Sequence, residues 1–214
     1  MTSKSLLVTR PEHDIATRYL ARWSEPVLKE ARRKGVSVVD LHKKKASSSR
    51  VLGVLKKRSP RLVFLNGHGS DEVVTGHDNE VILDEGDKEA VEGKIFFARA
   101  CKSAKKLGPA SVASGAAAYV GYEENFVFLL NENKTSRPLE DQTAALFLEP
   151  SNHVIIALLK GHSAREANER SRRLYGANIA RLLTQEGSED YDAVKLLYWD
   201  MVHQVVCGDE NAVF

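Results

Sequence analysis

Residues 62–69 have the sequence LVFLNGHG, in which four apolar residues lead into a glycine-rich turn that contains His68. A short apolar run bounded by turn residues predicts a strand that is buried on both faces. Residues 94–101, KIFFARAC, repeat the arrangement and place Cys101 at the end of a second such strand. We therefore expect two buried strands that each deliver one reactive side chain at the carboxyl end.

The segments on either side of these strands alternate between strand and helix patterns. Apolar runs at 5–9, 36–41 and 116–122 predict further strands, residues 72–83 a small hairpin, and residues 14–31 and 48–58 helices, the first of them interrupted after Ser24 by Pro26. Such alternation is typical of a parallel sheet covered by helices on both faces. The predicted fold class is α/β, a three-layer αβα sandwich with a mostly parallel sheet.

The last third of the chain is predicted to be mainly helical. Residues 123–141 are polar and predict a long loop, a kind of segment that is often functional. Helices are expected at 141–148 and 152–160 and after Ser163, which forms a capping box with Glu166. Residues 193–206 predict a helix, a strand, or one of each. Because neither a repeat nor a linker divides the chain, we expect a single domain over 1–214.

Composition excludes several classes of protein. The chain has 214 residues, 43% hydrophobic and 28% charged, which is ordinary for a globular protein and argues against disorder. No apolar run reaches the roughly 18 residues of a membrane span, and residues 1–10 lack the pattern of a signal peptide. With only two cysteines, the sequence predicts a cytoplasmic protein without a membrane segment, in which any cysteine chemistry rests on a single thiol.

Partners and cofactors leave few signals. Residues 1–62 carry 16 Lys and Arg against 5 Asp and Glu, although the whole chain has a net charge of only +2. No aromatic or recognition motif accompanies the basic residues, so they are expected to be solvated helix faces and nucleic-acid binding is disfavoured. No phosphate-binding glycine fingerprint and no regular spacing of metal ligands occurs. We expect neither a metal nor an organic cofactor.

His68 and Cys101 together indicate nucleophilic catalysis. In an open parallel sheet the ligand crevice lies beyond the carboxyl ends of the strands, where both residues are predicted to be. A thiolate can attack a peptide carbonyl, and a histidine can protonate the leaving amine. The backbone amides of Gly69 and Cys101 are candidates for an oxyanion hole. A helix beginning at Lys102 is expected to favour the thiolate form of Cys101. Taken alone, a buried cysteine or a loop histidine is usually without a catalytic function, and it is the pair that indicates one.

This pattern resembles the caspase-like clan of cysteine peptidases, in which one hydrophobic strand ends in His-Gly and another in Ala-Cys. The CHAT-domain and gingipain branches look most similar, because residues 161–163 (GHS) before a helix and residues 205–209 (VVCGD) resemble their motifs. The resemblance implies a caspase-like topology and a cysteine endopeptidase with His68 and Cys101 as catalytic dyad and the amides of Gly69 and Cys101 as oxyanion donors. It also implies a protein or peptide substrate and a place in prokaryotic defence. Control is expected from an activating partner, from oligomerisation or from cleavage within 123–141.

Substrate specificity is predicted from three further residues. Alternation along the strand places Arg99 on the same side as Cys101. In relatives the residue two before the cysteine lines the pocket for the side chain that precedes the cut, so Arg99 favours an acidic side chain there. Glu123 and Glu124 follow the next strand and favour a basic one, or else neutralise Arg99.

Two other functions stay open. The first is a catalytically silent caspase-like module that binds a partner or acts as a scaffold. The second is a doubly wound nucleotide or nucleic-acid binder in which His68 and Cys101 are incidental.

Overall fold

A central six-stranded sheet organises the computed structural model, which describes residues 4–184 and 193–214; positions 1–3 and 185–192 of the predicted domain lie outside it. The strand order is β2-β1-β3-β6-β7-β8, and only β7 and β8 run antiparallel. β3 and β6 are neighbours at the centre, as the sequence predicts. The strands are β1 (Ser5–Arg10), β2 (Ser37–His42), β3 (Leu62–Asn66), β6 (Ile95–Arg99), β7 (Ala118–Tyr122) and β8 (Gln204–Gly208), with a separate hairpin of β4 (Val73–Thr75) and β5 (Val81–Asp84).

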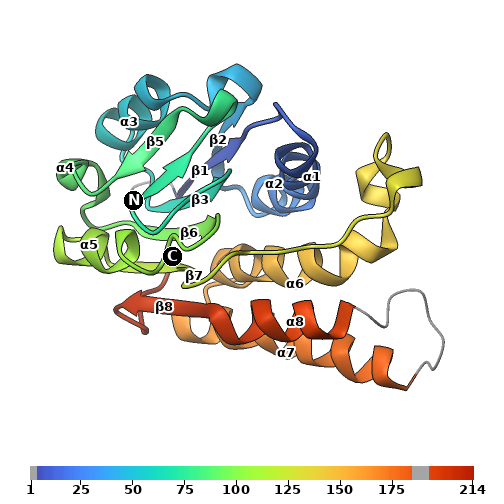
Figure 1. The fold of residues 1–214 in the computed structure, drawn as a ribbon. Helices are drawn as coiled ribbons and strands as arrows, with labels where there is room; N and C mark the ends of the chain where they lie inside the picture. Colours follow the sequence, from blue (N-terminus) through green and yellow to red (C-terminus); the bar gives the residue numbers. More distant parts are fainter. Residues whose placement is uncertain (1–3, 185–192) are drawn as a thin grey trace.

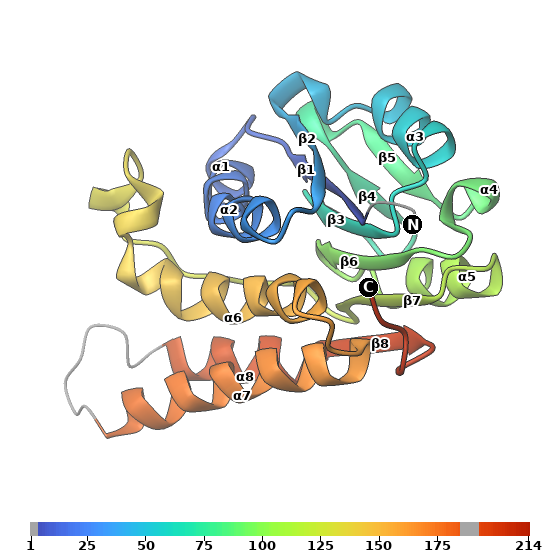
Figure 2. The ribbon, with the colours of Figure 1, turned by 180° about the vertical axis from the view of Figure 1, so that it is seen from behind.

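Helices cover both faces of the sheet, which confirms the three-layer α/β sandwich (Figure 1). One layer holds α3 (Ser48–Lys57), α4 (Lys88–Val91) and α5 (Leu107–Ala113). The other holds α1 (Ile15–Trp23), α2 (Glu25–Arg33) and α6 (Gln142–Leu159), and α7 (Ala164–Leu183) and α8 (Ala193–His203) pack beneath α6 (Figure 2). Short 3₁₀ turns complete the chain at Lys43–Lys45, His77–Asn79, Glu132–Lys134 and Pro138–Glu140.

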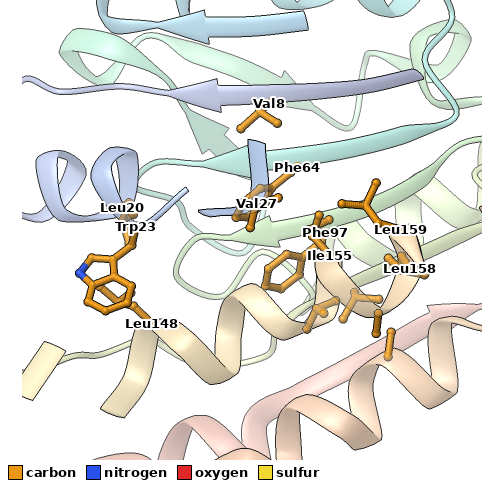
Figure 3. Close-up of a cluster of buried hydrophobic side chains, with 14 of the residues drawn as sticks. Val8, Leu20, Trp23, Val27, Phe64, Phe97, Leu148, Ile155, Leu158 and Leu159 are labelled. Atoms are coloured by element: carbon orange, nitrogen blue, oxygen red, sulfur yellow. The ribbon is translucent and has the colours of Figure 1, made fainter. Parts of the chain in front are cut away.

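The central strands supply the core on both of their faces. Along β3, Leu62 and Phe64 face α1, α2 and α6, whereas Val63 and Leu65 face α3 and the hairpin. In Figure 3, Phe64 and Phe97 from adjacent strands lie against the apolar side of α6, and their rings stack at 5.2 Å between centroids. Burial on both faces explains why these strands read as continuous apolar runs. Among the described residues, no helix is both long and apolar enough to cross a bilayer.

Some element boundaries differ from the sequence prediction. The break after Ser24 is confirmed, and 193–206 is one helix and one strand, which was among the alternatives. The two helices expected between 141 and 160 are one helix, α6, which continues through Pro150 because burial between the sheet and α7 outweighs local propensity. The helix expected at 102–107 is absent there, and α5 begins only at Leu107.

Candidate active site

The strand register places His68 and Cys101 side by side along the sheet edge. Asn66 of β3 is the Cα partner of Arg99 of β6, so each candidate lies two residues beyond the same rung of the ladder. The turns that follow also adjoin, because a Cβ added to Gly69 would lie 2.9 Å from the Cys101 carbonyl oxygen. Only glycine fits at that approach. The catalytic hypothesis requires the strands before His68 and Cys101 to be neighbours, and β3 and β6 are neighbours in the sheet.

An aspartate that sequence reasoning missed holds His68. The Nε2 atom of His68 lies 2.6 Å from Asp14 Oδ2, and both side chains are about 40% exposed, at 44% and 40%. Asp14 caps α1, where its Oδ1 accepts the Thr17 N–H at 2.7 Å. Burial alone raises the pKa of Asp14, but the bonds from His68 and Thr17 outweigh it and lower the pKa to about 2. Asp14 is thus an anion fixed beside Nε2 of the imidazole.

Cys101 lies in a more enclosed place than the sequence predicts. Its Sγ donates to the carbonyl of Phe126 at 3.6 Å. Burial raises the pKa of the Cys101 thiol, which opposes the expected stabilisation of the thiolate. The expected helix dipole is missing because a turn follows the cysteine, with Lys102 at φ 55°, and α5 starts five residues later. The thiol of this conformation is therefore mainly protonated at neutral pH.

A segment of the long loop covers the thiol, and we call residues 123–130 the strap. On the side of the site, its Glu124 carbonyl accepts the Lys102 N–H at 3.0 Å. On the other side α8 holds it, since Trp199 Nε1 donates to the Asn125 carbonyl at 2.9 Å. Phe126 is buried between these anchors and packs on Tyr122, with ring centroids 4.8 Å apart. The strap thus connects α8 to Cys101.

Asp200 on α8 is a second acidic residue that sequence reasoning did not single out. It is fully buried, and its Oδ1 accepts the Val127 N–H of the strap at 3.1 Å. Its Oδ2 has no hydrogen-bond partner among the described residues. Burial raises the pKa of Asp200 well above its ordinary value, so the neutral acid is favoured. The sequence does not single out Asp200, because an aspartate within an apolar helix is normally expected on its solvent-exposed side.

The geometry argues against the predicted role of Arg99 in substrate binding. Its side chain is fully buried, and its guanidinium makes five hydrogen bonds, all to neutral oxygens. Burial lowers its pKa to about 10, which leaves it charged at neutral pH. Its donors are occupied, so Arg99 joins the central strands to the helices that cover them. The acceptors are Asn66 Oδ1, Asn152 Oδ1, Ser24 Oγ and the Leu20 carbonyl.

Glu123 and Glu124 do follow β7 beside the candidate thiol. Glu123 is exposed and its backbone N–H donates to the His203 carbonyl at 3.0 Å, whereas the Glu124 carboxylate lies 3.3 Å from Lys105 Nζ. Neither carboxylate neutralises Arg99, whose contacts are given above.

Comparison with known proteins supports the fold. No protein-family model and no curated protein matches the chain. A solved structure of Porphyromonas gingivalis RgpB, a complex of pro- and mature domains, is similar with a TM-score of 0.61 and 12% identity, over 97% of this chain and 47% of that one. CalE6, a methionine gamma lyase from Micromonospora echinospora, matches with a TM-score of only 0.32, 10% identity, 97% of this chain and 56% of that chain. This chain therefore spans about half of the RgpB chain, and the two share a caspase-like fold.

Proposed function

We propose that this chain is a cysteine endopeptidase that uses His68 and Cys101 as a catalytic dyad. The observation that carries the proposal is the register of β3 and β6, which sets a histidine and a thiol at equivalent positions on neighbouring strands. The caspase-like fold supports it. The substrate is a protein or peptide, and neither a metal nor an organic cofactor takes part in the reaction.

The reaction follows from the positions of these groups. Cys101 Sγ loses its proton to His68 and attacks the scissile carbonyl carbon, forming a tetrahedral oxyanion. The amides of Gly69 and Cys101, from two adjoining turns, donate to that oxygen. Collapse breaks the C–N bond, and His68 delivers its proton to the leaving amine. Water, deprotonated by His68, then hydrolyses the thioester and regenerates the thiol.

Asp14 acts as a positioning residue in this scheme. Its hydrogen bond to Nε2 fixes the ring and directs Nδ1 toward the reacting groups. The imidazolium formed during the reaction is also stabilised by the nearby carboxylate. Because α1 holds the other carboxylate oxygen, this support costs little ordering during catalysis.

From the enclosed thiol we infer regulation by displacement of the strap. A substrate carbonyl must replace the Phe126 carbonyl at Sγ, and the strap must release α8 for this to occur. An activating protein partner that binds α8 or the segment 131–141 would supply that change. The RgpB structure, which holds pro- and mature domains together, supports control of this fold by a protein partner.

Weakening the strap's anchor on α8 is expected to expose the thiol. Trp199→Ala removes the bond to the Asn125 carbonyl, worth about 0.5–1.5 kcal/mol, so the open population rises about two- to tenfold. Alkylation of Cys101 by iodoacetamide, followed by peptide mass spectrometry at pH 8, measures this rise. The rate is also expected to keep increasing above pH 9, because the raised pKa delays formation of the thiolate.

The matched control is Tyr198→Ala, which removes a neighbouring aromatic ring that is 57% exposed. It should leave the alkylation rate of Cys101 unchanged. Cys207, whose thiol pKa is also raised by burial, serves as an internal reference in both variants. Equal rates at Cys101 in the two variants contradict a closing role for the strap.

A catalytically silent binding module is the second candidate, and the Phe126 carbonyl on the thiol favours it. The two functions differ in the reactivity of the thiol with substrate-like reagents. A peptidyl acyloxymethyl ketone should label Cys101 of Trp199→Ala and fail to label Cys207. Labelling that is absent, or equal at both cysteines, assigns the chain to the silent module.

Peptide cleavage is expected to be faster after Arg or Lys than after Asp or Glu. With Arg99 buried, the remaining candidates for substrate binding are Glu123, which is exposed, and Glu124, which pairs with Lys105; we expect the two carboxylates to attract a cationic side chain. A panel of fluorogenic peptides that differ only in the residue before the cut measures the preference as kcat/KM. Glu123→Gln with Glu124→Gln should reduce the advantage of the basic peptides, and faster cleavage after Asp in the unaltered chain would contradict the expectation.

A further inference from the structure

Two further histidines, His13 and His77, gather beside His68 of the candidate dyad, although the sequence places the three in separate segments. The rings of His13 and His68 lie 5.9 Å apart between centroids, and those of His13 and His77 lie 5.3 Å apart. Asp14 lies between the first two: its Oδ2 is 2.6 Å from His68 Nε2 and 3.5 Å from His13 Nε2. Two imidazole nitrogens thus meet one carboxylate oxygen.

The buried ring of His13 has only one of its two nitrogens paired within the part of the chain that the structure describes. Its side chain is only 11% exposed, and its Nε2 lies 3.2 Å from Asn79 Oδ1 on an exposed turn. Its Nδ1 is buried without a hydrogen-bond partner among the described residues. A buried imidazole nitrogen without a partner costs free energy and calls for an explanation, of which a nearby bound ion is one.

We propose that His13, Asp14 and His68 form a binding site for a divalent transition-metal ion, Zn²⁺ in the first instance. One donor atom of each residue lies within 4.8 Å of the other two. Donors about 2.0–2.2 Å from a tetrahedral zinc lie roughly 3.3–3.6 Å apart, so binding needs side-chain shifts of about 1 Å. Two imidazoles with one carboxylate suit zinc, whereas calcium and magnesium prefer an all-oxygen set. Water completes the fourth position.

The carboxylate is already prepared for an ion. Asp14 Oδ1 is held by the first turn of α1, which leaves Oδ2 directed at the two rings. Each ring must present an unprotonated nitrogen to bind the ion. An adjacent depression of about 320 Å³, lined in part by His13 and Asp14, gives solvent access.

Metal binding has a consequence for the reaction, and only this part rests on the proposed function. Zinc binds His68 Nε2 and the Asp14 carboxylate. The His68 ring then loses the partner that orients it, and it can no longer act as the base of the reaction. The bound ion also opposes formation of the imidazolium. Zinc is therefore expected to be a reversible inhibitor that acts through His13, a residue outside the dyad.

Binding is tested first without any cysteine. In an untagged, chelator-treated chain carrying Cys101→Ala and Cys207→Ala, calorimetric titration with ZnCl₂ should show one zinc per chain, with no binding of CaCl₂. Adding His13→Ala should weaken zinc at least tenfold. His13→Asn, which keeps a polar side chain of similar reach, should do the same. His162→Ala, which removes a histidine that also pairs with a glutamate, should leave the affinity unchanged.

Two results separate this inference from the proposed function. Zinc binding that is unaffected by His13→Ala, or no binding at all, overturns the site whether or not the chain cleaves peptides. Where the chain cleaves peptides, zinc should inhibit it, EDTA should restore the rate, and His13→Ala should need at least tenfold more zinc. Zinc binding through His13 in a chain without cleavage keeps the site and overturns the peptidase.

Discussion

Replacing Cys101 with alanine is expected to lower kcat/KM for peptide cleavage by about four to six orders of magnitude, because no other group on this edge of the sheet can form the thioester. His68→Ala should cost a similar factor, since nucleophile and base act as one unit. The double variant should therefore be hardly slower than either single variant. Assays on the fluorogenic peptide that is cleaved fastest, with Trp199→Ala as the background if the unaltered chain is closed, measure these losses.

Cys207→Ala is the matched control for that experiment. Cys207 is the other free cysteine and lies on β8, outside the proposed dyad. Its Sγ is 3.8 Å from the Ala104 carbonyl oxygen. Its loss should leave kcat/KM unchanged. Thermal unfolding of each variant must match that of the parent chain, because a lost fold also abolishes cleavage. Full activity in folded Cys101→Ala contradicts the peptidase.

The second large effect concerns stability and arises at Arg99. Arg99→Ala is expected to lower the free energy of unfolding by about 3–5 kcal/mol, because buried acceptors lose their donors and a cavity forms beneath Phe64. Arg99→Met, which keeps most of the volume, should cost less but still destabilise, since the Oδ1 atoms of Asn66 and Asn152 lose the donors that Arg99 supplies. Urea unfolding followed by tryptophan fluorescence gives these differences.

A role of Arg99 in substrate binding would lead to the opposite result. If its guanidinium bound an acidic substrate side chain, Arg99→Met would fold as stably as the parent and would change only the ranking of the peptide panel. Arg50→Ala, an exposed arginine on α3, is the control for a charge change at the surface and should leave stability near that of the parent. Unchanged stability in Arg99→Met would overturn the structural role.

The sequence alone determined the architecture and the identity of the dyad candidates. Hydrophobic periodicity in runs such as 62–65 and 95–100 depends only on which faces of an element are buried, so strand and helix alternation could be predicted locally. Short parallel strands place the residues after them on one edge, and this rule brought His68 and Cys101 together before any coordinates. The close approach of Gly69 to the Cys101 turn was not predicted and is known only from the structure.

Only the tertiary structure decided how each side chain is surrounded. Arg99, Asp14 and Asp200 each stand in an unremarkable local sequence, and their roles depend on partners 33 to 79 residues away or on burial by a distant helix. The thiol was expected to be activated by a helix, yet the strap covers it, because loop 123–130 packs on α8 through contacts that no local pattern encodes. Hydrogen bonding and desolvation act through space, so the state of an ionisable group follows from the fold and not from its neighbours in sequence.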